Sequence, residues 1–141
     1  MEVYNMSTQL SPEILKLFTD FQQAELDGVL TYQKLAELTD DEQLKAAFKE
    51  AAADEGRHAA VLKSYTNANL TPNSAGAEQL AAAAAMFDMS TLLDGMSKGE
   101  YAGYDVYAPL IKDYPLLESV MNDERKHGEM LAAEAERLRN K

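Results

Sequence analysis

Each of the two histidines in this chain stands three residues after a glutamate. The motifs read DEGRH at residues 54–58 and DERKH at residues 123–127, so Glu55 is paired with His58 and Glu124 with His127. Residues i and i+3 of an α-helix are neighbours on one face, about 4.5 Å apart along the axis, so a carboxylate and an imidazole can converge on one metal ion. One such pair is weak evidence. Two pairs on two different helices strongly indicate a metal site and predict a bundle in which these faces meet.

Length and composition limit the classes of protein to consider. A chain of 141 residues is expected to form one domain with a sizeable core. The formal net charge of -11 argues against nucleic-acid binding, which needs a clustered basic surface. The lack of cysteine excludes disulfides, Cys-ligated zinc and iron–sulfur clusters, so a metal would be bound by Glu, Asp and His. Residues 1–10 have no basic segment before an apolar run, and no run of about 18 apolar residues occurs, so we expect a soluble cytoplasmic protein without membrane contact.

Helical periodicity runs through almost the whole sequence and predicts an all-α fold. We expect residues 1–10 to be an N-terminal extension and residues 11–141 to form the bundle. The first helix should begin with Ser11 as N-cap and Pro12 at N1, and Glu25 interrupts its apolar stripe. A capping box over residues 39–42 should open the second helix, and the short turn makes the two helices antiparallel neighbours.

The remaining sequence predicts a long crossover and a second hairpin. Residues 67–76 have the Asn, Pro, Ser and Gly content of a loop, and residues 77–89 should form a short helix within the crossover. A third long helix is predicted over residues 90–112, with a kink at Pro109, and a fourth should begin near Pro115. The expected architecture is an antiparallel ferritin-like four-helix bundle with its long crossover between the second and third long helices.

Polar residues interrupt all four apolar stripes at one depth. They are Glu25, Glu55, His58, Glu100, Glu124 and His127. Several kcal/mol are lost for each buried unpaired carboxylate, against a typical net stability of about 5–15 kcal/mol, so four carboxylates must be neutralised, by cations or, less completely, by protonation. Two divalent ions balance four carboxylates. Ferritin-like di-iron and di-manganese proteins use this ligand set, with the glutamates of the two Glu-x-x-His motifs as bridges, one further glutamate capping each ion and one histidine ligating each ion.

At the level of whole segments, the chain resembles the ferritin-like domain of the rubrerythrin family. The resemblance lies in residues 24–62, which include DEGRHA at 54–59, in GEYAGYDVYAP at 99–109, and in DERKH at 123–127. It implies a di-iron site with redox activity toward peroxide. Two departures from the family are evident. A second glutamate of the third helix is replaced by Gly103, which leaves the symmetric six-residue set, and no cysteine is present to bind rubredoxin iron, so electrons should come from an external donor protein.

The leading functional expectation is a non-haem di-iron oxidoreductase that reduces hydrogen peroxide or activates O₂. The alternatives are a ferroxidase or iron-storage protein, a vestigial site, and a manganese or mixed-metal centre. Nothing in the sequence predicts haem. Tyr32, two turns after Glu25, is a candidate to hydrogen-bond a ligand carboxylate, and Tyr104 is a candidate to line the pocket. The expected partners are a small oxidant and an electron-donor protein. The oligomer considered is a homodimer.

Overall fold

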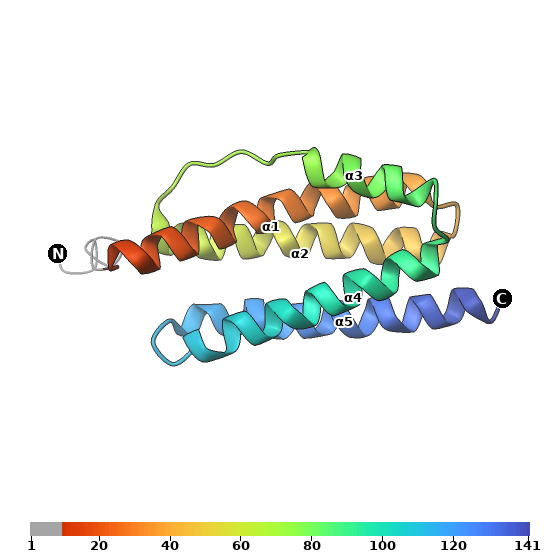
Figure 1. Cartoon of the computed structure of the whole chain (residues 1–141). Helices are drawn as coiled ribbons and strands as arrows, with labels where there is room; N and C mark the ends of the chain where they lie inside the picture. Colours follow the sequence, from red (N-terminus) through yellow and green to blue (C-terminus); the bar gives the residue numbers. More distant parts are fainter. Residues whose placement is uncertain (1–9) are drawn as a thin grey trace.

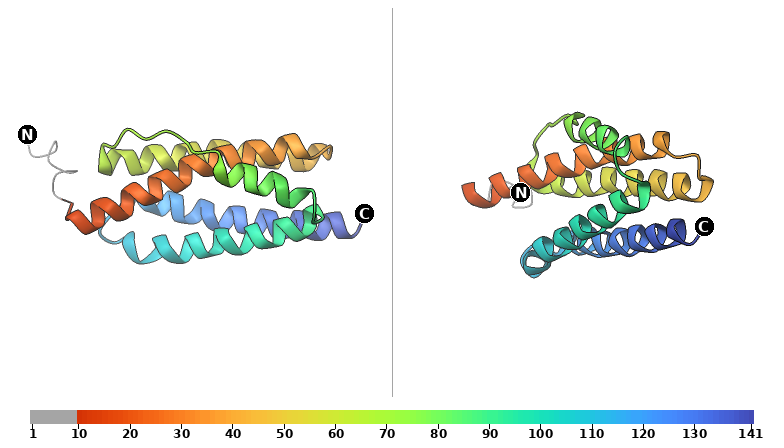
Figure 2. Two further views of the ribbon diagram at one scale, coloured as in Figure 1. Left: turned by 45° about the horizontal axis from the view of Figure 1, so that its top comes forward. Right: turned by 45° about the vertical axis from the view of Figure 1, so that its right-hand side comes forward.

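The structure is a computed structural model that describes residues 10–141. The long helices form two antiparallel hairpins that pack against each other (Figure 1). Within the described part of the chain the helices are α1 (Pro12–Leu38), α2 (Glu42–Thr66), α3 (Ala75–Ala84), α4 (Met89–Tyr107) and α5 (Glu118–Arg139). The crossover returns along the outside of the α1–α2 hairpin, so α4 starts at the same end of the bundle as α2 and runs in the same direction (Figure 2). This arrangement confirms the predicted ferritin-like bundle.

Capping residues explain where α1 and α2 begin, and they correct one prediction. Ser11 caps α1 with its hydroxyl, and Pro12 occupies the first turn as predicted. The predicted capping box at residues 39–42 is wrong, because Thr39 ends α1 in an extended conformation and lies outside α2. The N-cap of α2 is Asp41, whose carboxylate accepts the backbone N–H of Leu44 at 2.9 Å. The N-cap of α2 therefore lies two residues later than the capping box implied, and the turn is longer.

The crossover and the second hairpin differ from prediction in where their helices end. Asn67 ends α2 in the left-handed conformation, with φ of 57°, and α3 covers an earlier segment than the predicted residues 77–89. Pro109 does not kink a continuing helix: α4 ends at Tyr107 and a 3-10 turn follows at Ala108–Leu110. Proline has no N–H to donate to the preceding turn, so a helix is easily ended there. A second 3-10 turn at Pro115–Leu117 delays the start of α5.

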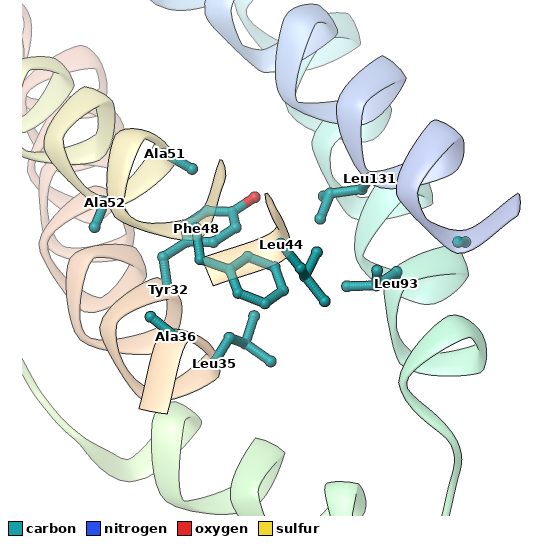
Figure 3. Close-up of a cluster of buried hydrophobic side chains, with 10 residues drawn as sticks. Tyr32, Leu35, Ala36, Leu44, Phe48, Ala51, Ala52, Leu93 and Leu131 are labelled. Atoms are coloured by element: carbon teal, nitrogen blue, oxygen red, sulfur yellow. The ribbon is translucent and has the colours of Figure 1, made fainter. Parts of the chain in front are cut away.

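Two apolar clusters fill the interior of the bundle, one at each end. The Phe48 cluster lies beside the α1–α2 turn and contains Tyr32, Leu35, Ala36, Leu44, Phe48, Ala51, Ala52, Leu93, Leu131 and Ala135 (Figure 3). The Phe18 cluster lies beside the α4–α5 turn and contains Phe18, Leu62, Tyr65, Tyr107, Leu117, Val120 and Met121. Burial of a large apolar side chain contributes about 1.5–3 kcal/mol before entropy is counted. The clusters therefore hold the hairpins together above and below a polar band.

The predicted N-terminal extension falls almost entirely outside the described residues, since residues 1–9 are not described. Leu10, which we had assigned to that extension, packs against the Phe18 cluster. None of the helices formed by residues 10–141 is both long enough and apolar enough to cross a lipid bilayer.

Candidate metal centre

The polar band lies at the middle of the four long helices. Glu25 illustrates how the sequence places it there: the residue comes seven positions, or about two helical turns, after Phe18 of one apolar cluster and seven before Tyr32 of the other. The same spacing puts Glu100 midway between Leu93 and Tyr107, which lie in the two clusters. Each helix therefore carries its polar residue to the same depth.

The structure brings all six predicted site residues together. They form two groups in which one candidate ligand atom from each residue lies within 4.8 Å of the others: Glu25, Glu55, His58 and Glu124 in one group, and Glu55, Glu100, Glu124 and His127 in the other. Glu55 and Glu124 belong to both groups. Two ions bridged by a pair of shared carboxylates would require this overlap. We call the first group the Glu25 half of the centre and the second the Glu100 half.

Each histidine turns its Nδ1 atom toward the centre. Nδ1 of His58 lies 2.9 Å from Glu25 Oε1, and Nδ1 of His127 lies 3.5 Å from Glu100 Oε1. Burial alone lowers the pKa of His58, but hydrogen bonds to neighbouring carboxylates, Glu25 first, outweigh this and raise it to about 11 for the protein groups alone. A metal ion bound here would therefore compete with protons for the same nitrogen atoms.

Two aspartates orient the histidines from behind, and the sequence interpretation assigned them no role. Nε2 of His58 lies 2.8 Å from Asp123, and Nε2 of His127 lies 2.8 Å from Asp54. An aspartate that accepts the Nε2–H proton leaves the Nδ1 lone pair free to bind a metal. Burial raises the pKa of Asp54, but hydrogen bonds led by that from His127 lower it to about 2, so it remains an acceptor. The repeated Asp before each motif glutamate was the available signal.

Two tyrosines hold the outer glutamates, and each reaches across to the other hairpin. The hydroxyl of Tyr32 donates to Glu100 Oε2 at 2.6 Å, and that of Tyr107 donates to Glu25 Oε2 at 3.0 Å. Burial raises the pKa of both tyrosines, so both remain protonated donors. The sequence interpretation missed Tyr107, although it follows Glu100 by the same seven residues that separate Tyr32 from Glu25. Tyr104, which the sequence interpretation named as a candidate to line the pocket, packs against the Phe18 cluster.

Two glycines leave the room that the shared glutamates occupy. A Cβ atom on Gly28 would overlap Oε1 of Glu55 and lie 3.3 Å from its Cδ, and a Cβ atom on Gly103 would overlap Oε1 of Glu124 and lie 3.3 Å from its Cδ. Both glycines follow an outer glutamate by one helical turn. The place of a second glutamate on α4 is therefore filled by the carboxylate of Glu124, which extends across from α5.

The donor set fits a pair of cations. Four buried polar atoms have no hydrogen-bond partner within the described residues: Glu55 Oε2, Glu100 Oε1, Glu124 Oε2 and His127 Nδ1. All four belong to the Glu100 half of the centre, which shares two of these residues with the Glu25 half. Burial raises the pKa of Glu55 to about 8. Burial together with repulsion from Glu25 and Glu100 raises that of Glu124 to about 11. Cations would relieve both effects, since they supply partners and opposite charge.

Fold and centre together define the class: a ferritin-like four-helix bundle with a buried carboxylate and histidine cluster that could hold metal. The family model described as Rubrerythrin matches residues 16–135, which is most of the chain and includes all six cluster residues. The protein therefore belongs to the rubrerythrin family. No match was found among curated proteins or among solved structures.

Proposed function

We propose that this protein is a non-haem di-iron oxidoreductase that reduces hydrogen peroxide, or activates O₂, with electrons from another protein. The observation that carries the proposal is the set of four buried atoms without partners, one from each residue of the Glu100 half, whose candidate ligand atoms lie within 4.8 Å of one another. Each buried polar atom left unpaired costs about 1–3 kcal/mol, and a charged one costs more. Four such atoms at one place are best explained by a bound group that pairs with them all.

In this proposal each residue of the centre has a defined role. Glu25 and His58 would hold one iron, Glu100 and His127 would hold the other, and Glu55 and Glu124 would be shared by the two. A mixed shell of carboxylate and imidazole suits iron, and manganese is the alternative metal for the same ligands. When bound, the two ferrous ions would supply the two electrons that, together with two protons from solvent, convert one hydrogen peroxide molecule into two waters.

The chain's own residues support this chemistry by position. Asp54 and Asp123 fix the tautomers of the histidines, and Tyr32 and Tyr107 hold the outer glutamates at fixed angles. The two apolar clusters limit water at both ends of the centre. Because none of the 141 residues is cysteine, rubredoxin-type iron has no ligands in this sequence, and the reductant in the proposal is another protein.

Metal analysis with a visible spectrum tests the centre directly. Protein expressed in iron-replete medium is expected to contain two iron ions per chain, and well under one ion per chain would refute the dinuclear proposal. Replacement of the bridging residue, Glu55→Ala, should abolish binding of at least one ion. The matched control is Glu50→Ala, an exposed glutamate of the same helix, which should bind metal as the parent protein does.

Rapid mixing of the diferrous protein with hydrogen peroxide or with O₂ separates the functions. Much faster oxidation by peroxide supports a peroxide reductase. Rapid O₂ uptake by a hollow oligomer of high mass would support iron storage instead, because storage needs a cage of many subunits.

A further inference from the structure

A pocket of about 220 Å³ lies between α1 and α4, beside the Glu25 half of the centre. Phe21 and Ala24 of α1 line it together with Ala102 and Val106 of α4, and two glutamates of the centre, Glu25 and Glu124, also line it. Both glutamates are nearly fully buried, whereas the two alanines and Val106 are exposed. The pocket therefore leads from the surface of the bundle to the side chains of the centre.

The size of the pocket and the chemistry of its walls select its occupant. Pockets for drug-sized organic molecules measure about 300–1,000 Å³, so this one is small for such a ligand. One water takes about 30 Å³ of liquid volume, so several molecules the size of O₂ or hydrogen peroxide fit. The outer walls, formed by Phe21, Ala24, Ala102 and Val106, are hydrocarbon. Against such walls an uncharged small molecule loses much less hydration free energy than an aqueous ferrous ion does. Among the lining residues Tyr107 alone has a side-chain hydroxyl.

The two hairpins repeat the same motifs, Glu-x-x-Gly on the first helix and Asp-Glu-x-x-His on the second, so the bundle has an approximate two-fold axis. The surface equivalent to the pocket on the other side of this pseudo-two-fold axis is polar. The Glu-x-x-Gly segments of α1 and α4 are offset by 75 residues, so Ala102 corresponds to Asp27 and Val106 corresponds to Thr31. Asp27 accepts a backbone N–H of the crossover at 2.7 Å, and the hydroxyl of Thr31 donates to the backbone carbonyl of Asp27. Hydrogen-bonded polar side chains therefore stand where the pocket has methyl groups. The two halves of the centre differ in their approaches although their candidate ligands match.

We propose that this pocket is the route by which an uncharged small oxidant, hydrogen peroxide or O₂, reaches the Glu25 half of the centre. The inference rests on the proposed di-iron function and adds to it the side of entry. It also favours reduction of an oxidant over iron storage, because storage would require repeated passage of hydrated ferrous ions.

Narrowing the pocket tests the route. Ala24→Leu and Ala102→Leu each add an isopropyl group at an exposed lining position that contributes no candidate ligand. The matched control is Gly99→Leu, because Gly99 precedes Glu100 as Ala24 precedes Glu25, and a Cβ atom there meets nothing within 4 Å. Nitric oxide is a suitable probe, being uncharged and diatomic. Its binding to the anaerobic ferrous protein is followed by stopped-flow absorption.

We expect both lining variants to slow nitric oxide association by about tenfold or more, with iron stoichiometry unchanged, and the control to bind at the parent rate. Equal rates in all four proteins, each with two iron ions per chain, would overturn the route and leave the di-iron proposal intact. A control slowed as much as Ala24→Leu would overturn the one-sided entry. A parent protein that binds fewer than two iron ions would overturn the di-iron proposal and, with it, the route.

Discussion

Gly103→Ala is the smallest change that should disable the proposed centre while leaving the bundle folded. The new Cβ atom would overlap Oε1 of Glu124, so the carboxylate must withdraw by roughly an ångström to reach a normal contact distance. Metal–ligand distances tolerate about 0.2 Å, so Glu124 could no longer bridge two ions. Its side chain is flexible and borders the pocket between α1 and α4, but a movement into that space would take its oxygens away from the other candidate ligands.

The expected loss can be worked out from this displacement. Disturbing even an outer hydrogen-bond partner of a ligand costs about 10–100-fold in metal affinity, so displacing a bridging ligand should cost at least about 100-fold, or about 2.7 kcal/mol. With metal in excess, the same amount is lost from the metal-dependent stabilisation of the fold. For a chain of this length, about 1 kcal/mol shifts Tm by about 3 °C, so the metal-induced rise in Tm should shrink by about 8 °C.

Gly99→Ala is the control for helix propensity, because it makes the same substitution on the same helix in open space. Both variants gain about 0.5–1 kcal/mol of helix stability in the metal-free protein. Thermal unfolding with and without Fe²⁺ or Co²⁺ measures the difference between them. If Gly103→Ala kept the full metal-induced rise of the parent and of Gly99→Ala, the reasoning that Glu124 needs the space above this glycine would be refuted.

Three further outcomes are expected. Phe48→Ala removes a fully buried ring and should cost about 3–5 kcal/mol in urea unfolding of the metal-free protein; a loss under about 1 kcal/mol would contradict the packing. Asp123→Asn removes the carboxylate behind His58 and should weaken metal binding by about 10–100-fold in a titration, so unchanged affinity would leave the aspartate without this role. The metal-free protein should become less stable as pH rises from about 5 to 8. In the folded protein Glu124 and His58 have pKa values of about 11 and keep their protons over this range, whereas in the unfolded chain the same groups lose them near pH 4.5 and 6.5. Metal-loaded protein should show the opposite trend over this range, since its ligands are already deprotonated, and Tm measured against pH with and without metal checks the signs.

The fold and the convergence of six polar residues were predictable because both follow from spacing along single helices. Apolar residues at two-turn intervals define each stripe, and a glutamate at the midpoint must meet its counterparts once the helices pack. Helix ends were less predictable, because neighbouring residues can each fit the same capping position and one residue can fit more than one role. Thr39 and Asp41 both fit a helix N-cap, and the position of Pro109 permitted either a kink or an end.

Contacts between the hairpins were the part that sequence patterns did not provide. Asp123 and Tyr107 lie on helices whose partners depend on how the two hairpins dock, and a pattern along one helix does not contain that information. The internal repeat did contain a hint, since each residue has a counterpart at the matching position of the other hairpin. The pocket beside Ala24 was harder still to predict from the sequence. It depends on the distance between α1 and α4 and on which side chains fill the space between them.

The pseudo-two-fold arrangement links the proposed centre to the stability of the whole bundle. Four hydrogen-bonded pairs at this level join one hairpin to the other: His58 with Asp123, His127 with Asp54, Tyr32 with Glu100, and Tyr107 with Glu25. A hairpin alone would keep one outer glutamate, one shared glutamate and one histidine. It would lose all of the hydrogen-bond partners that orient them from the other hairpin. Metal affinity in the proposed centre therefore depends on docking of the hairpins. By linkage, the free energy by which docking strengthens metal binding equals the free energy by which bound metal stabilises the docked state. Metal should accordingly protect backbone amides across the α2–α5 interface from hydrogen exchange more than it protects those of α3, which contributes no candidate ligand.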